Sequence, residues 1–366
     1  MTLRAMGPFN GTLPVPTGMI QGFMRDPWKM PYLRYAQLIP APEIVFNYWR
    51  LDPDEAARMV DLNANAWAYG DYRPTGKGFQ IRVEMLDDRT QRWDFPYTLD
   101  TNTQRVWERG AGFDPKFLFD RVRAVQAHLH RAMRVVAALQ AAPWGGYNSA
   151  TPQQLLGLDD PVYFDDSSGT ELTPSGNPNP NFQIIKKTLN AVKRRITLQT
   201  NGAVTGEELV WVLPPEDAQI VAQSGEIVNA VKQSQFARDY VVNPNIEDWG
   251  LPDRYAGWKI VVEDTAKVLV NAQDNGTIAN VTQPNQRDFI MPAGTSYFVS
   301  RPGGLDGNYG FQNFSTVQCY HFNGEARIEA FSEPKHDLIE GHVVMEDKVI
   351  PPLTISGFQL TGYLES

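Results

Sequence analysis

Five histidines and one cysteine are the side chains best suited to bind a metal ion or to act as a nucleophile or proton carrier. The histidines match no metal-ligand spacing, since the sequence holds neither His-Glu-X-X-His nor Cys-X-X-Cys. Cys319 lies in an alternating apolar run, which predicts a buried, unreactive thiol. The histidines are His128, His130, His321, His336 and His342.

Motifs for other chemistries are also absent from the sequence. There is no Gly-X-Ser-X-Gly and no P-loop, and the glycine-rich stretch 302–310 predicts a turn because it lacks Gly-X-Gly-X-X-Gly. The carboxylate pairs Asp87-Asp88 and Asp165-Asp166 lie in polar, turn-like surroundings. We therefore expect no catalytic residue, no cofactor and no metal. A soluble hydrolase without a recognisable motif stays open as an alternative.

The composition is that of a globular protein with more than one domain. The 366 residues are 42% hydrophobic and 20% charged. The net charge of −9 argues against bulk attraction to nucleic acid or anionic lipid, although a local basic face stays possible. The N-terminal stretch lacks the apolar region of a signal peptide, and no run is long enough to span a membrane. We expect a soluble protein that is made inside the cell.

The elements that position these residues begin with a proline-rich segment over residues 1–50. It holds seven prolines and many large apolar side chains, so it is too apolar for a free linker. Two interpretations stay open: an extended arm that lies against another body, or an irregular segment that covers its own domain.

Residues 79–99 predict a β-hairpin. Apolar and polar residues alternate on both sides of a polar turn at 87–90, which is a strand-pair pattern. A lone hairpin is marginal in water, so its apolar face must lie on another surface. We expect that surface to belong to a neighbouring subunit. The predicted contact residues are Phe79, Ile81, Val83, Trp93, Phe95 and Tyr97.

A long helix is predicted from Pro115 to Ala142, because Asp114-Pro115 is a helix start and no glycine or proline interrupts the run. Apolar residues recur at spacings of three and four and form one stripe. Basic residues fall largely outside that stripe. They are interpreted either as a solvated face or as an inward face turned toward DNA phosphates or an acidic partner. The candidate residues are Arg121, Arg123, Arg131 and Arg134.

The rest of the chain predicts helices followed by strands. A helix is expected over 182–198, a buried strand over 208–213, and short helices over 215–222 and 224–233. Beyond Trp258 the pattern is mostly alternating strands separated by glycine turns. The predicted class is α+β.

This order of parts resembles the major capsid proteins of tailed phages, which have the Hong Kong 97-type fold. The stretch 70–107 is similar to their extended E-loop, and 114–142 is similar to the spine helix of their P-domain. IIKKTLNAVKRRI at 184–196, followed by ELVWVLPPEDAQIV at 208–221, resembles the first helix and strand of their A-domain. The closing stretch 337–360 resembles their last P-domain strands.

The resemblance implies a domain plan and a set of partners. Its parts are an N-terminal arm over 1–60, an E-loop hairpin over 61–110, a P-domain with spine helix over 111–181, an A-domain over 182–325, and return strands of the P-domain over 326–366. It implies pentamers and hexamers in an icosahedral shell around double-stranded DNA, with a separate scaffolding protein, a portal and a possible decoration protein. It also implies a virion component that is made in the cytoplasm of a host bacterium, with no membrane partner.

Two departures and one further alternative accompany the resemblance. The closing strand carries Glu340, His342, Glu346 and Asp347, where members of the family often have arginines. No N-terminal scaffold-like helical region is present, so assembly would need a separate scaffold or the arm. An encapsulin-like bacterial compartment shell is the alternative within the same fold.

Overall fold

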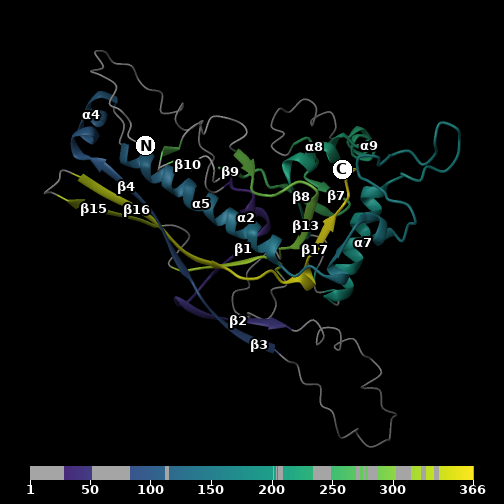
Figure 1. The fold of residues 1–366 in the computed structure, drawn as a ribbon, viewed down its shortest axis with the longest axis horizontal. Coiled ribbons are helices and arrows are strands. Elements are labelled where there is room, and N and C mark those ends of the chain that lie inside the picture. The colour runs from purple at the N-terminus through teal and green to yellow at the C-terminus, as the bar shows by residue number, and fades with distance from the viewer. Residues whose placement is uncertain are drawn as a thin grey trace, which may run out of the picture.

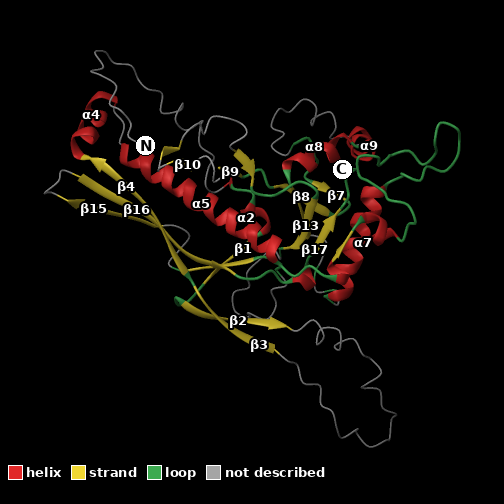
Figure 2. Cartoon of the chain, viewed as in Figure 1, coloured by secondary structure: helices red, strands yellow, loops and turns green. Residues whose placement is uncertain are grey.

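The computed structural model describes most of the chain. The described residues are 29–51, 83–111, 115–200, 202, 204, 209–233, 249–268, 273–274, 277–278, 287–301, 315–322, 327–333 and 338–365. Helices and strands are mixed through the whole length (Figure 2). A six-stranded sheet with its helices lies at one end of a long diagonal helix, and a long curved sheet follows the rest of that helix (Figure 1).

The six-stranded sheet has the order β5-β17-β13-β6-β8-β7. Its central strand β6 contains Leu209–Leu213 and is completely buried, because it reads as a continuous apolar run and is covered on both faces. Strand β6 pairs in parallel with β8 and antiparallel with β13. The other strands are β5 (Ser149–Ala150), β7 (Arg254–Tyr255), β8 (Trp258–Val262), β13 (Thr295–Ser300) and β17 (Phe358–Thr361).

Two hydrophobic clusters cover the two faces of this sheet. On one face Trp211 and Phe298 pack with the apolar side of α7 (Ile184–Gln199) and with α8 (Pro215–Gln223). On the other face Val210 and Val299 pack with the C-terminal half of the long helix and with a short N-terminal helix. Helix α9 (Gly225–Gln233) supplies Glu226, whose carboxylate accepts the first backbone N–H groups of α7.

The long helix α5 contains Pro115–Ala141 and spans about 40 Å. It follows the shorter α4 (Thr101–Ala111), which the sequence did not predict. It packs on a five-stranded sheet in which β16 (Leu338–Val349) pairs with three strands: β4 (Gln91–Asp100), β15 (Arg327–Glu333) and β14 (Gln318–His321).

The start of the described chain belongs to the core of the same chain. Helix α2 (Tyr32–Tyr35) buries both tyrosines against the six-stranded sheet and α5. Strand β1 (Gln37–Pro40) then pairs in parallel with β14. Of the two interpretations of residues 1–50, residues 29–41 therefore match the segment that covers its own domain. Residues 1–28 lie outside the described residues.

The predicted hairpin of residues 79–99 was wrong in its pairing. Strand β3 (Val83–Arg89) pairs with β2 (Val45–Leu51), while β4 pairs with β16, so the two predicted arms do not pair with each other. Between them the backbone N–H of Thr90 donates to the Ile44 carbonyl at 2.9 Å. The stretch 87–90 holds no glycine or asparagine, the residues that tight hairpin turns favour, and the chain continues in an extended form.

The other predicted elements are confirmed within a residue or two. Helices α5, α7, α8 and α9 and strand β6 lie where the sequence placed them. The strand-rich remainder is also present. Its smaller pieces are β9 (Ala266–Val268) paired with β12 (Arg287–Phe289) and β10 (Gln273–Asp274) paired with β11 (Thr277–Ile278). Before α7 the chain also forms the short helix α6 (Pro152–Leu156).

Candidate assembly surface

The side of the five-stranded sheet that faces α5 is an apolar core. Trp93 and Phe95 pack with Ala127, Val343 and Met345, and the Tyr97 ring stacks on Phe119 with 5.6 Å between ring centroids. Trp93, Phe95 and Tyr97 were predicted to contact a neighbouring subunit. Their described contacts are with helix α5 and strand β16 of the same chain. Phe79 and Ile81 lie outside the described residues, and for Val83 only the backbone pairing with Leu51 is described.

A buried carboxylate, Asp347, ties this sheet to the long helix. Its two oxygens accept hydrogen bonds from Arg131 Nε and Arg134 Nη1, both at 2.5 Å. Asp347 and Arg131 are fully buried, and the Arg134 guanidinium also lies over the Trp93 ring at 4.5 Å. A buried charge is tolerated when it is paired and hydrogen-bonded, as it is here.

This arrangement corrects the predicted basic face of α5. Arg131 points into the core, and Arg134 is held by the same carboxylate. Arg121 and Arg123 are half-buried, and Arg123 donates a hydrogen bond to Gln126 at 2.6 Å. The four arginines therefore do not form one face for DNA. The prediction was wrong because helix periodicity alone does not reveal that β16 offers an inward-facing acid. That acid is visible in the sequence, at an inward position of the run Val343, Met345, Asp347.

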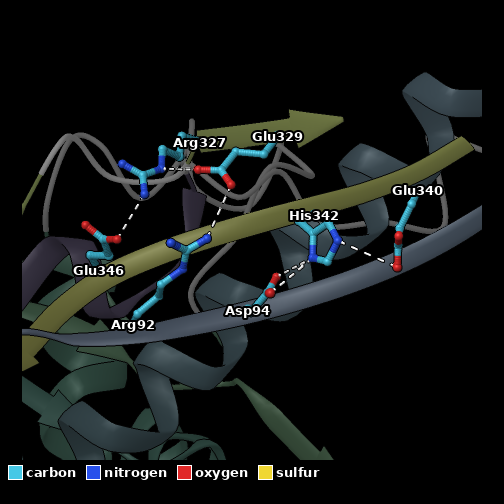
Figure 3. Close-up of polar contacts among 7 residues, drawn as sticks. All are labelled: Arg92, Asp94, Arg327, Glu329, Glu340, His342 and Glu346. Atoms are coloured by element: carbon cyan, nitrogen blue, oxygen red, sulfur yellow. Dashed lines mark hydrogen bonds and ion pairs between the residues drawn. The ribbon is translucent and has the colours of Figure 1, made fainter. Parts of the chain in front are cut away.

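The opposite face of the same sheet carries a network of ion pairs, which we call the charged sheet face. It consists of Arg92 and Asp94 on β4, Arg327 and Glu329 on β15, and Glu340, His342 and Glu346 on β16 (Figure 3). These residues lie on one side because strand side chains alternate, and their neighbours along each strand, such as Trp93 and Val343, face α5.

Each described cation of the charged sheet face has an acidic partner. Arg327 bridges Glu329 at 2.8 Å and Glu346 at 2.9 Å, and Arg92 contacts Glu329 at 3.2 Å. His342 Nδ1 lies 3.0 Å from Asp94 (Figure 3). These pairs are partly exposed, so each stabilises the fold only modestly. A face of mixed, mutually paired charge is poorly suited to bind a polyanion such as DNA.

Two tyrosine hydroxyls fix helix α2 between separate parts of the fold. The Tyr32 hydroxyl lies 2.7 Å from His128 Nδ1 on α5. The Tyr35 hydroxyl donates to Glu263 at 2.6 Å, just beyond β8. The sequence did not single out these contacts, although two buried tyrosines three residues apart in a short helix could have suggested them.

Burial changes the acidity of both partners of α2. Burial, and then the nearby Arg131 charge, lower the pKa of His128 from 6.5 to about 4, although Asp347 opposes the shift. Burial raises the pKa of Glu263 from 4.5 to about 7, although hydrogen bonds from Thr265 and Tyr35 oppose the shift. His128 is therefore neutral near pH 7, and Glu263 changes charge there.

The described residues offer little for metal or membrane chemistry. Within them, no group of three or more histidine, cysteine, aspartate or glutamate side chains could hold a metal ion. Among the same residues, no helix is long and apolar enough to cross a membrane. Cys319 is buried on β14, as predicted.

The antiparallel pair β2–β3 leaves the body of the protein. Figure 1 shows it below the five-stranded sheet. Near its base, Phe46 and Tyr48 pack with Tyr320 and anchor one face. Val45, the first residue of β2, and the preceding Ile44 are exposed, at 57% and 47% of their surface.

Comparison with solved structures places this architecture. The chain is similar to a phage-related protein from Bordetella bronchiseptica RB50, with a TM-score of 0.52 and 12% identity over 94% of this chain and 95% of that chain. It is also similar to the mature capsid of bacteriophage PhiM1, with a TM-score of 0.49 and 12% identity over 97% and 91% of the two chains. A third similar structure is the SrpI encapsulin of Synechococcus elongatus PCC 7942, with a TM-score of 0.45 and 10% identity over 97% and 92%.

No protein-family model and no curated protein sequence matches the chain. The structural likeness establishes the fold: an α+β protein of the Hong Kong 97 type, as the order of elements predicted.

Proposed function

We propose that this chain is the major capsid subunit of a tailed phage, which assembles into an icosahedral shell around double-stranded DNA. The observation that carries the proposal is the β2–β3 pair. Two strands that leave the body are marginal in water, and Val45 of β2 and the preceding Ile44 are exposed. A neighbouring copy would cover them, and a contact between unlike surfaces of identical copies repeats around a ring.

The proposed partners follow from a closed shell. Rings of five and six copies would form it, with a separate scaffolding protein and a portal, and with a decoration protein as a possible addition. The subunit would be made in the cytoplasm of a host bacterium and would end in the virion. The proposal assigns it no catalytic step.

The first test is negative-stain electron microscopy of the purified full chain, with size-exclusion chromatography alongside. Closed shells, or rings of five and six subunits, are expected, with or without a co-expressed scaffold. A protein that stays monomeric under all these conditions and hydrolyses a substrate would overturn the proposal. Shells that enclose protein cargo and no nucleic acid would instead identify a compartment shell.

A pair of matched variants tests the role of β2–β3. Val45→Asp places a charge on the exposed face of this pair, while Leu172→Asp places the same charge on a loop residue that is 56% exposed. We expect Val45→Asp to leave the monomer folded and to reduce shell yield at least several-fold, because a desolvated charge opposes association. Leu172→Asp should assemble normally. Equal yields from both variants would argue against an intersubunit contact at Val45.

A further inference from the structure

Basic side chains from four elements meet at one end of the six-stranded sheet. Arg254 on β7 stands directly opposite Lys259 on β8. Lys259 on β8 pairs in register with Val210 on β6, and Val210 pairs in register with Val299 on β13. Arg301 follows Val299 by two residues. Alternation along the strands therefore places Lys259, Val299 and Arg301 on the same face.

That face is the one covered by helix α2, which adds a fourth cation. Val210, Val261 and Val299 pack there with Tyr32 and Tyr35. Arg34 of α2 is close enough to Lys259 to act on its charge, as are Arg254 and Arg301. We call Arg34, Arg254, Lys259 and Arg301 the sheet-end basic cluster.

The charges of Arg254, Lys259 and Arg301 are not balanced by ion pairs within the described residues. Asp253 acts on Lys259 only at a distance. Burial and then the three arginines lower the pKa of Lys259, and burial lowers the pKa of Arg301. An anion bound here would relieve both effects.

Several other basic groups among the described residues are already engaged. Arg131 and Arg134 are bound to Asp347. Arg195 of α7 donates to the Tyr147 carbonyl at 3.1 Å and lies over the Tyr147 ring. Arg92 and Arg327 are paired on the charged sheet face. The sheet-end basic cluster differs because its positive charges face one another.

We propose that the sheet-end basic cluster binds backbone phosphates of nucleic acid. The proposal rests on the proposed function and identifies the face of the subunit that is turned toward the enclosed DNA. Lys259 and Arg301 are separated by strand β6, so the charges extend over two strand spacings, about 10 Å. That spread suits a polyanion with repeated charges better than one small ion. Guanidinium groups match phosphate oxygens in geometry as well as charge.

The test compares two double variants that each remove two positive charges. Lys259→Gln/Arg301→Gln changes the cluster, and Lys186→Gln/Lys187→Gln changes two exposed lysines of α7, which packs on the other face of the sheet. Binding of a fluorescent 30-base-pair DNA is measured by anisotropy over a salt series, and circular dichroism confirms that each variant is folded. Wild type should bind at low salt. The cluster variant should lose about tenfold or more in affinity for the DNA. The slope of log K against log salt concentration should become shallower by about the amount that two phosphate contacts contribute.

Equal losses in the two variants would reduce the effect to overall charge and overturn the proposal. Absence of DNA binding by wild type at low salt would also overturn it. A poly-glutamate peptide that binds more tightly than DNA, and loses affinity in the same variant, would assign the cluster to an acidic protein segment instead. Electron microscopy of the same preparations separates this result from the proposed function, because shells can form while the cluster proposal fails.

Discussion

The ring of Tyr97 lies directly over the backbone of Gly341 on the neighbouring strand. The two residues are paired in register, and a Cβ atom built on Gly341 would come within 2.1 Å of the Tyr97 ring. With its ring in this position, Tyr97 stacks on Phe119 and its hydroxyl donates to Asp120, both on α5. A glycine on β16 thus allows one side chain of β4 to hold the long helix against the sheet.

This contact predicts a large effect of one methyl group. Gly341→Ala should lower the free energy of unfolding by about 1–3 kcal/mol, because the added carbon overlaps a packed ring. Gly145→Ala is the control, since no atom lies within 4 Å of its built Cβ. Chemical denaturation measures both. In the background Tyr97→Ala, the cost of Gly341→Ala should shrink, and an unchanged cost would disprove the overlap.

Asp347 and Glu346 are adjacent on β16 but face opposite sides of the sheet. Asp347→Ala should cost about 3–5 kcal/mol, because it leaves Arg131 buried without its counter-charge. Glu346→Ala should cost about 1 kcal/mol or less, since its pair with Arg327 is partly exposed. Denaturation curves of the two variants at one pH make the comparison. Similar costs would contradict the inward position of Asp347.

Glu263 should make the fold less stable as the pH rises. Its folded pKa of about 7 exceeds the value of 4.5 expected in the unfolded chain, so the folded state holds the proton more tightly. The resulting stability is fully present below pH 4.5 and is lost as the pH rises through 7. Between pH 5 and pH 8 the ionisation of Glu263 should lower the free energy of unfolding by about 2–3 kcal/mol. Glu263→Gln should abolish that part of the pH dependence, and Asp264→Asn, a change at its half-buried neighbour, should retain it.

His128 should have the opposite dependence. Its folded pKa of about 4 lies below the 6.5 of the unfolded chain, so its contribution is present above pH 6.5 and is lost as the pH falls through 4. Between pH 7 and pH 5 the loss should be about 2 kcal/mol. His128→Gln keeps a polar partner for Tyr32 and should lack this loss. His342→Gln, on the charged sheet face, should retain it; if it does not, His128 is not the source.

The sequence by itself determined the bounds of the main helices and of the central strand, and which of their residues share a face. Helix α5 begins at Pro115 because proline suits the first turn, and the run 209–213 is a buried strand because it is apolar throughout. The alternation Trp93, Phe95, Tyr97 correctly indicated one apolar face of a strand. These signals are local, so one sequence is enough to reveal them.

Only the tertiary structure decided which strands pair and which charges are buried. The alternation of residues predicts an apolar face for β3 and for β4. It does not predict that β3 pairs with β2, or that β4 pairs with β16, some 240 residues later. The same holds for Arg131, whose position on a helix looked like a solvated face until Asp347 was placed beside it. Pairing depends on free-energy differences between distant segments, and a local pattern carries no information about its partner.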